Sequence, residues 1–144
     1  MKKYKLTVGI PIFNGEKNID ERIKEILSQT YSDFCIIISD NGSTDTTRKI
    51  CENLSKIDNR ITFFHNKENR GVFWNFNFLL NNAETEYVVI APLDDIWSKN
   101  FLESNINILE NSKEVVGSIG ECSLFNRILD PKTNKYKKNI IPNK

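Results

Sequence analysis

The run Phe-Cys-Ile-Ile-Ile at residues 34–38 constrains the fold more than any other part of this sequence. Successive apolar residues without polar alternation predict a strand that is covered on both faces. Such strands are typical of parallel sheets, in which a helix usually connects one strand to the next. The run therefore predicts an α/β protein.

The flanking sequence alternates between strand and helix patterns. Apolar residues alternate with other types over residues 6–12, which predicts a strand. Pro11 cannot donate a hydrogen bond to a neighbouring strand, so we expect the strand to end or to lie unpaired there. The alternation predicts a mostly parallel sheet with helices on both faces. Further strands are predicted at 61–64 and 87–91, and helices at 19–29, 45–56, 73–82 and 99–111.

The last part of the chain differs from the rest. Residues 115–125 are apolar enough for one or two more strands, whereas residues 126–144 are rich in Lys and Asn. We therefore expect one domain over residues 1–125, followed at 126–144 by an arm or a loosely held hairpin. The basic tail is interpreted as a solvated face, with contact to an anionic membrane surface as the alternative.

Composition excludes several classes of protein. A length of 144 residues suits a single domain, and a net charge of +1 argues against a dedicated nucleic-acid binder. The 3 cysteines are far apart, which fits neither a disulfide framework nor a zinc site. There is no apolar run long enough to span a membrane and no apolar signal region after the basic start. We therefore expect a cytoplasmic protein.

Three polar clusters follow predicted strands, at residues 11–16, 39–45 and 92–97. Because ligands of open parallel sheets bind beyond the carboxyl ends of the strands, we expect a site where these clusters meet at one edge. Glycine-rich dinucleotide, P-loop and catalytic-serine motifs are absent from the sequence.

Two of the clusters allow both a structural and a functional interpretation. In the segment 40–45, Asn-Gly is a turn signal and Ser43, Thr44 or Asp45 could cap the next helix, while Asp40 could bind a ligand. Asp94 and Asp95 could cap a helix or lie in a solvated turn. The alternative is that they bind Mg²⁺ or Mn²⁺, because adjacent carboxylates repel each other unless they are solvated or neutralised.

Taken in order, these segments resemble the amino-terminal, nucleotide-sugar-binding half of glycosyltransferase family 2, which has the GT-A fold. The resemblance extends over about residues 6–125. The matching segments are Thr-Val-Gly-Ile-Pro-Ile-Phe-Asn at 7–14 with Glu16, Ile-Ser-Asp-Asn-Gly-Ser-Thr-Asp at 38–45, Asn-Arg-Gly at 69–71, Asn77, Glu-Tyr at 86–87 and Leu-Asp-Asp-Ile-Trp at 93–97.

The resemblance implies a role for each matching residue. Pro11 and Phe13 would line the pocket of the base, Asp40 would hydrogen-bond the base or ribose, and Asp95 would be the more direct ligand of Mn²⁺ or Mg²⁺. The nucleotide-binding residues expected in this way are Pro11, Phe13, Asn14, Glu16, Asp40, Asn41, Arg70 and Asp94, with Asp94 and Asp95 holding the metal.

The expected activity is transfer of a sugar from a nucleotide-diphosphate sugar, UDP-linked by expectation, to an acceptor hydroxyl by an inverting displacement, in polysaccharide or glycoconjugate synthesis. The expected partners are this donor and a glycan or lipid-linked acceptor, without nucleic acid; a homodimer and contact with the cytoplasmic face of a membrane stay open.

The resemblance is incomplete in two respects. Pro92 and Leu93 stand where many relatives carry a further acid, and no general base is identified in this chain. The chain covers the donor-binding half of the family, so we expect a truncated or minimal member. The alternative is a non-catalytic fragment that binds nucleotide sugars and needs a missing acceptor half. A nucleotidyltransferase is disfavoured because residues 11–17 form no glycine-rich basic loop.

Overall fold

The computed structural model describes residues 4–112, 114–120, 125–130 and 135–140. The chain divides into two compact units, Met1–Ser104 and Asn105–Lys144. No helix in the described ranges is both long and apolar enough to cross a membrane.

The first unit is built on a four-stranded parallel sheet with the strand order β3-β2-β1-β4. Strands and helices alternate along the chain, as predicted. The elements are β1 (Leu6–Ile12), α1 (Ile19–Leu27), β2 (Phe34–Asp40), α2 (Thr47–Ile57), β3 (Ile61–His65), α3 (Val72–Asn82), β4 (Tyr87–Ile90) and α4 (Phe101–Asn111), of which the last crosses into the second unit.

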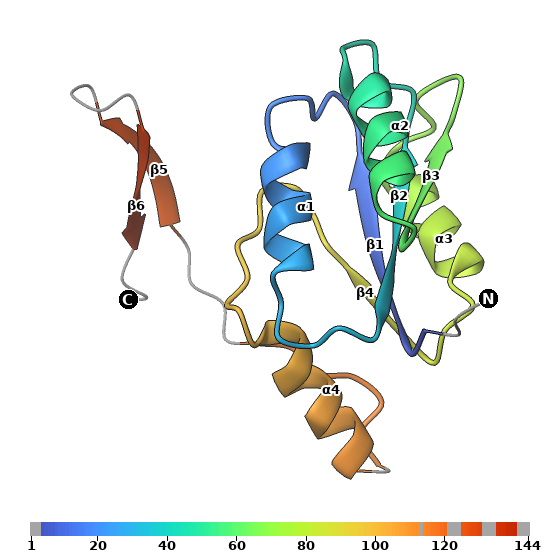
Figure 1. Ribbon diagram of the computed structural model, residues 1–144, viewed down its shortest axis with the longest axis vertical. Coiled ribbons are helices and arrows are strands. Elements are labelled where there is room, and N and C mark those ends of the chain that lie inside the picture. The colour runs from blue at the N-terminus through green and yellow to red at the C-terminus, as the bar shows by residue number, and fades with distance from the viewer. Residues whose placement is uncertain (1–3, 113, 121–124, 131–134, 141–144) are drawn as a thin grey trace. The chain divides into compact units, whose positions relative to one another are not determined.

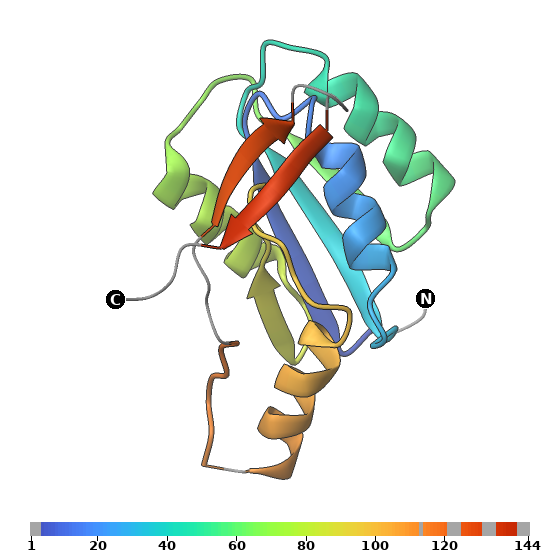
Figure 2. The ribbon, with the colours of Figure 1, turned by 90° about the vertical axis from the view of Figure 1, so that its left-hand side faces the viewer.

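The connections determine which face of the sheet each helix covers. From β1 through β2 to β3 the chain moves in one direction across the sheet, and then it returns past β1 to β4. Because such crossovers are right-handed, α1 and α2 lie on one face and α3 lies on the other (Figures 1 and 2). The carboxyl ends of β1 and β4 therefore flank the point where the strand order reverses, which is where ligands of such sheets bind.

The core lies around the two central strands. Every residue of β2 except Cys35 is buried, which confirms the prediction of a strand covered on both faces. The largest fully buried apolar side chains come from β1, β2 and the helices α1, α3 and α4: Val8, Ile10, Phe34, Ile36, Ile38, Ile19, Ile23, Ile26, Leu79 and Leu102.

The prediction that β1 would end or lose its pairing at Pro11 was wrong. The strand continues to Ile12, and Pro11 pairs in register with Ser39 on β2. Along a strand, the backbone N–H and C=O groups of every second residue point toward the same neighbouring strand. The Gly9 carbonyl accepts a hydrogen bond from the Ala91 amide, just after β4. The backbone nitrogen of Pro11, two residues after Gly9, therefore also points toward the β4 side. Pairing with β4 has already ended at Gly9 opposite Ile90. The missing N–H of Pro11 therefore costs no bond to β2.

The second unit contains an antiparallel pair, β5 (Phe125–Asp130) and β6 (Lys135–Ile140). The sequence predicted an arm or a loosely held hairpin over 126–144, and the two strands pair with each other from Phe125 to Ile140. The prediction of strands within 115–125 was wrong for residues 115–120, which have no regular secondary structure. Residues 121–124 lie outside the described ranges.

Gly42 shows how tightly the loop after β2 packs. Its φ is +79°, and an added Cβ would lie 2.5 Å from the backbone carbon of Glu68. The left-handed backbone and the close approach of a second loop both exclude a side chain.

Gly42→Ala should therefore destabilise the fold. The backbone conformation costs about 1–2 kcal/mol for a residue with a Cβ, and the overlap with Glu68 adds about 1–3 kcal/mol. The matched control is Gly117→Ala, because a Cβ there meets nothing within 4 Å. Urea unfolding measures both variants, and equal stability of the two would contradict this account of the loop.

Candidate functional site

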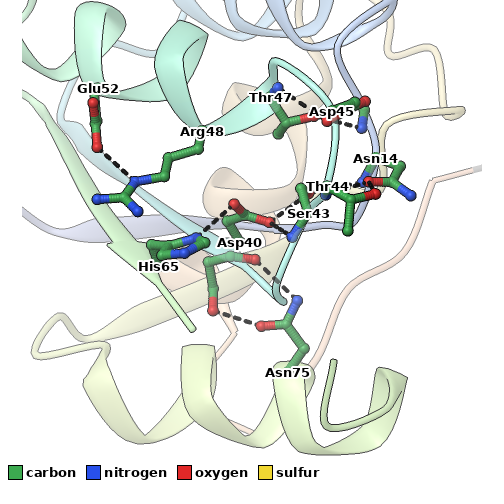
Figure 3. Close-up of polar contacts among 12 residues, drawn as sticks. Asn14, Asp40, Ser43, Thr44, Asp45, Thr47, Arg48, Glu52, His65 and Asn75 are labelled. Atoms are coloured by element: carbon green, nitrogen blue, oxygen red, sulfur yellow. Dashed lines mark hydrogen bonds and ion pairs between the residues drawn. The ribbon is translucent and has the colours of Figure 1, made fainter. Parts of the chain in front are cut away.

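The loops that follow β1 and β2 are joined by side-chain hydrogen bonds (Figure 3). The Asn14 amide donates to Ser43 Oγ at 2.8 Å, and the Thr44 amide donates to Asn14 Oδ1 at 2.9 Å. Asn14 has a φ of 51°, a left-handed conformation that Asn tolerates better than most residues. The polar clusters after β1 and β2 are therefore joined in one hydrogen-bonded network.

Asp40, the last residue of β2, lies beneath this junction with a fully buried side chain. Its Oδ1 accepts hydrogen bonds from the Ser43 amide at 3.0 Å and from Ser43 Oγ at 2.5 Å. Its Oδ2 lies 2.9 Å from His65 Nδ1, at the end of β3. Figure 3 shows Asp40 between these two residues. Both carboxylate oxygens thus have protein partners, and a direct contact between Asp40 and a base stays a prediction.

The start of α2 is capped from two loops. Asp45 Oδ1 accepts the Thr47 amide at 3.0 Å, and Glu16 Oε2 accepts the Thr46 amide at 3.0 Å and Thr46 Oγ1 at 2.6 Å. Glu16, predicted to be near the nucleotide, here connects the loop after β1 to the first turn of α2. The N-cap residue of α2 is Thr46, and Asp45, one residue earlier, supports the start of the helix through the Thr47 amide.

These bonds change the acidity of both caps. Hydrogen bonds from the Thr46 side chain and backbone lower the pKa of Glu16. Burial by itself would raise the pKa of Asp45, but hydrogen bonds from Thr47 and from the Glu16 amide outweigh it and lower the pKa. Folding therefore favours the ionised form of both carboxyl groups.

Gly15 brings the loop after β4 into the same cluster. Its amide donates to Thr47 Oγ1 at 2.8 Å, and an added Cβ would lie 2.5 Å from Leu93 Cδ1. Because Leu93 directly precedes Asp94, the segment with the two acids starts against the loop after β1. The three clusters therefore meet at one edge of the sheet, as predicted.

Asn41 fixes the loop before α3. Its Nδ2 donates to Asn69 Oδ1 at 2.9 Å and to the Gly71 carbonyl at 3.1 Å, and its Oδ1 accepts the Arg70 amide at 3.0 Å. Arg70 then stacks on Trp74, with its guanidinium carbon 4.6 Å from the ring centroid. The buried Asn41 side chain is occupied by the protein itself, so its contact with a nucleotide stays a prediction.

Pro11 and Phe13 lie at the end of β1, beside the reversal of strand order. Phe13 is 47% exposed and Pro11 is half-buried. An exposed aromatic ring at this edge is a surface on which a base could stack.

Asp94 and Asp95 are exposed and follow β4. Burial and the negative charge of Asp94 raise the pKa of the Asp95 carboxyl, while the positive charge of Arg22 opposes the increase. Within the described residues, no group of three or more His, Cys, Asp and Glu side chains is arranged to hold a metal ion. The pair fits a hard divalent cation only if donor phosphates and water supply its other ligands.

Sequence reasoning missed Arg22 and Glu25 near this site, and it did not predict that His65 contacts Asp40. The signal for Arg22 was its position three residues after Ile19 and four before Ile26, which places it on the buried face of α1. Figure 3 places His65 against Asp40. Only the register of β2 and β3, which the sequence does not reveal, brings them together.

The family model of Glycosyl transferase family 2 matches residues 7–143. The chain belongs to this family. Among curated relatives, glycosyltransferase GlyG of Streptococcus pneumoniae is 35% identical over 99 residues, which are 69% of this chain and 33% of GlyG. The chain therefore spans about a third of the length of that glycosyltransferase.

Two solved structures have a fold similar to that of this chain. S. aureus TarS 1–349 in complex with UDP-GlcNAc has a TM-score of 0.68 and 26% identity over 74% of this chain and 31% of that chain. Mannosyltransferase PcManGT from Pyrobaculum calidifontis, in complex with GDP-Man and Mn²⁺, has a TM-score of 0.68 and 25% identity. The match covers 76% of this chain and 33% of PcManGT. The predicted family and GT-A fold are confirmed.

The capping of α2 predicts that acid weakens the fold of this family 2 chain. Asp45 and Glu16 have a lower pKa in the folded state than their ordinary values of 3.8 and 4.5. Their stabilising contribution is therefore present above those values and is lost as the pH falls through the lower folded-state values.

The urea midpoint should decrease between about pH 5 and pH 3, and Asp45→Asn should make that decrease shallower. The control is Glu86→Gln, which removes one negative charge as Asp45→Asn does, at an exposed residue outside this loop cluster. An unchanged pH dependence in Asp45→Asn would contradict the role of the cap.

Proposed function

We propose that this chain is the donor-binding part of a glycosyltransferase that uses a nucleotide-diphosphate sugar, with UDP as the expected nucleotide. The observation that carries the proposal is that the acidic pair and the Asn14–Ser43–Asp40 junction occupy one sheet edge at the reversal of strand order. The similarity to a UDP-GlcNAc complex and to a GDP-Man complex supports a nucleotide-sugar donor. The donor-binding domain is proposed to span 1–125, with 126–144 as an arm.

The nucleotide is proposed to bind against the loop after β1, with its base stacked on the exposed ring of Phe13. Pro11, Asn14, Glu16, Asp40, Asn41 and Arg70 remain the candidate nucleotide residues. The hydrogen bonds already made by Asp40 and Asn41 indicate that these two act largely by holding His65, Ser43 and the 69–71 loop in place. A preformed loop cluster loses little conformational entropy when it binds a ligand.

Asp94 and Asp95 are proposed to hold Mn²⁺ or Mg²⁺ together with the donor diphosphate. A cation bound there would offset the negative charge that develops on the departing nucleotide. Two carboxylates hold such an ion weakly without phosphate ligands, so metal and nucleotide should bind more tightly together than either does alone.

The proposed reaction is an inverting displacement, with a role in polysaccharide or glycoconjugate synthesis. The acceptor oxygen forms a bond to the anomeric carbon as the bond from that carbon to the diphosphate oxygen breaks. A carboxylate takes the hydroxyl proton. No residue of this chain is assigned as that base.

Thermal unfolding with ligands tests the donor site. UDP with Mn²⁺ should raise the melting temperature more than UDP alone, because a ligand that binds only the folded state stabilises it. Asp95→Asn should remove the metal-dependent part of the increase. Glu86→Gln makes the same change in charge, but Glu86 lies just before β4, at the end of the strand opposite to Asp95. This variant should keep the metal-dependent increase in melting temperature. An absence of any increase with nucleoside diphosphates, with or without metal, would refute the proposal.

A second candidate is a donor-binding fragment without catalytic activity of its own. The share of GlyG that the chain spans, 33%, favours it. Incubation with UDP-sugars distinguishes the two candidates. Release of UDP that depends on Asp95 supports the enzyme, whereas binding without release supports the fragment.

A further inference from the structure

Arg22 is a buried cation on α1. The residue is 1% exposed, although arginine is rarely buried unless it is fully paired. Its Nη1 donates to Glu25 Oε2 at 2.9 Å, and its guanidinium carbon lies 4.3 Å from the centroid of the Trp97 ring. Since arginine keeps its charge in proteins, this burial needs a compensating environment.

The other oxygen of Glu25 holds the segment after β4. Glu25 Oε1 accepts a hydrogen bond from the Trp97 backbone amide, and the Trp97 ring stacks on Phe101 with centroids 4.5 Å apart. Arg22, Glu25 and Trp97 therefore form a clamp, which fastens the segment that carries Asp94 and Asp95 to α1.

The clamp leaves part of the guanidinium unused. Arg22 Nε and Nη2 are buried and have no hydrogen-bond partner among the residues that the structure describes. A buried donor without an acceptor costs about 1–3 kcal/mol, and more when it is charged. Such unsatisfied groups are few in native proteins, and a functional role is one of their recognised explanations.

A carboxylate of the acidic pair is the acceptor that the surroundings offer. Asp95 lies two residues before Trp97, whose ring packs against the Arg22 guanidinium and whose backbone amide bonds to Glu25. Both carboxylate oxygens of Glu25 are already bonded, one to Arg22 Nη1 and the other to the Trp97 amide. Carboxylates that bind a cation are commonly hydrogen-bonded from behind by a second residue, which fixes their orientation.

We propose that Arg22 is the positioning residue of the acidic segment 94–97. Through Glu25 and the Trp97 ring it fixes the backbone that carries Asp94 and Asp95, and its Nε–H and Nη2–H are donors for the Asp95 carboxylate when a donor substrate is bound. The second half of this inference rests on the proposed function, whereas the first half concerns the free chain.

The test compares the wild type with Arg22→Met/Glu25→Leu. This double variant removes the clamp without leaving a buried charge, a change that proteins often tolerate. Arg48→Met/Glu52→Leu is the matched control, because it removes an exposed pair of the same types on α2. Arg22→Lys is a second variant that keeps the charge but lacks the planar group and its additional donors.

Two measurements are made on each protein. Amide hydrogen exchange by NMR, without nucleotide or metal, reports the protection of the Trp97 amide. Titration calorimetry then measures how much Mn²⁺ tightens the binding of UDP. The double variant should exchange the Trp97 amide at least about tenfold faster, and the effect of Mn²⁺ on UDP affinity should decrease about 10–100-fold, with UDP alone binding as before. Arg22→Lys should show the same losses in smaller degree, and the control neither.

The outcomes separate the inference from the proposed function. Wild-type protection of Trp97 in both Arg22 variants would overturn the positioning role, whatever the chain binds. Rapid exchange with an undiminished effect of Mn²⁺ would overturn the link between Arg22 and Asp95. A wild type that binds no UDP would refute the proposed function, while the exchange data would still decide whether Arg22 fixes the segment. If the double variant does not fold, Arg22→Lys decides both points.

Discussion

The hydrogen bonds of Ser43 are the interaction on which the rest of this edge depends. Its hydroxyl donates to the buried Asp40 carboxylate and accepts the Asn14 amide, so one side chain joins the ends of β1 and β2. The same carboxylate holds His65 at the end of β3. Three strand ends of the parallel sheet are therefore connected through one buried carboxyl group, which has a short hydrogen bond to Ser43 on one oxygen and His65 beside the other.

The fourth strand is held differently, and the difference has a functional consequence. The segment after β4 contacts the loop after β1 through Leu93 and Gly15, and it is fastened to α1 through Arg22, Glu25 and Trp97. The nucleotide side of the proposed site is thus built on saturated hydrogen bonds. On the side proposed to hold the metal, Arg22 Nε and Nη2 have no hydrogen-bond partner among the described residues, and the carboxyl groups of Asp94 and Asp95 are exposed. Burial and the charge of Asp94 raise the pKa of Asp95. The part of the site that would respond to a ligand is therefore the acidic segment.

Local sequence patterns predicted the architecture well because each strand and helix in the first unit has its own periodicity. The apolar run at 34–38 and the three polar clusters were sufficient to predict the sheet and its polar edge. Pro11 was misjudged because a strand has two neighbours, and the sequence does not say on which side a missing N–H falls. The strands expected in 115–120 were predicted from apolar content alone, which does not supply a pairing partner.

The sequence predicted which polar segments lie at this edge of the sheet, but not which of their side chains are hydrogen-bonded to one another. Glu16 and Asp45 are 29 residues apart, yet the Glu16 amide donates to the Asp45 carboxylate at 3.3 Å and both carboxylates cap α2. Ligand binding by Asp40 stays a prediction, but the sequence did not predict that both of its oxygens have protein partners, Ser43 and His65. Such pairings depend on the register of neighbouring strands and on loop geometry, which residue types alone do not determine.

A crystal structure of the chain with UDP and Mn²⁺ tests the central claim most directly. The account predicts electron density for the nucleotide at the carboxyl edge of the sheet, with the base beside Phe13 and the diphosphate and metal at Asp94 and Asp95. Nucleotide density bound elsewhere on the chain, or an edge left unchanged at saturating UDP and Mn²⁺, would contradict it.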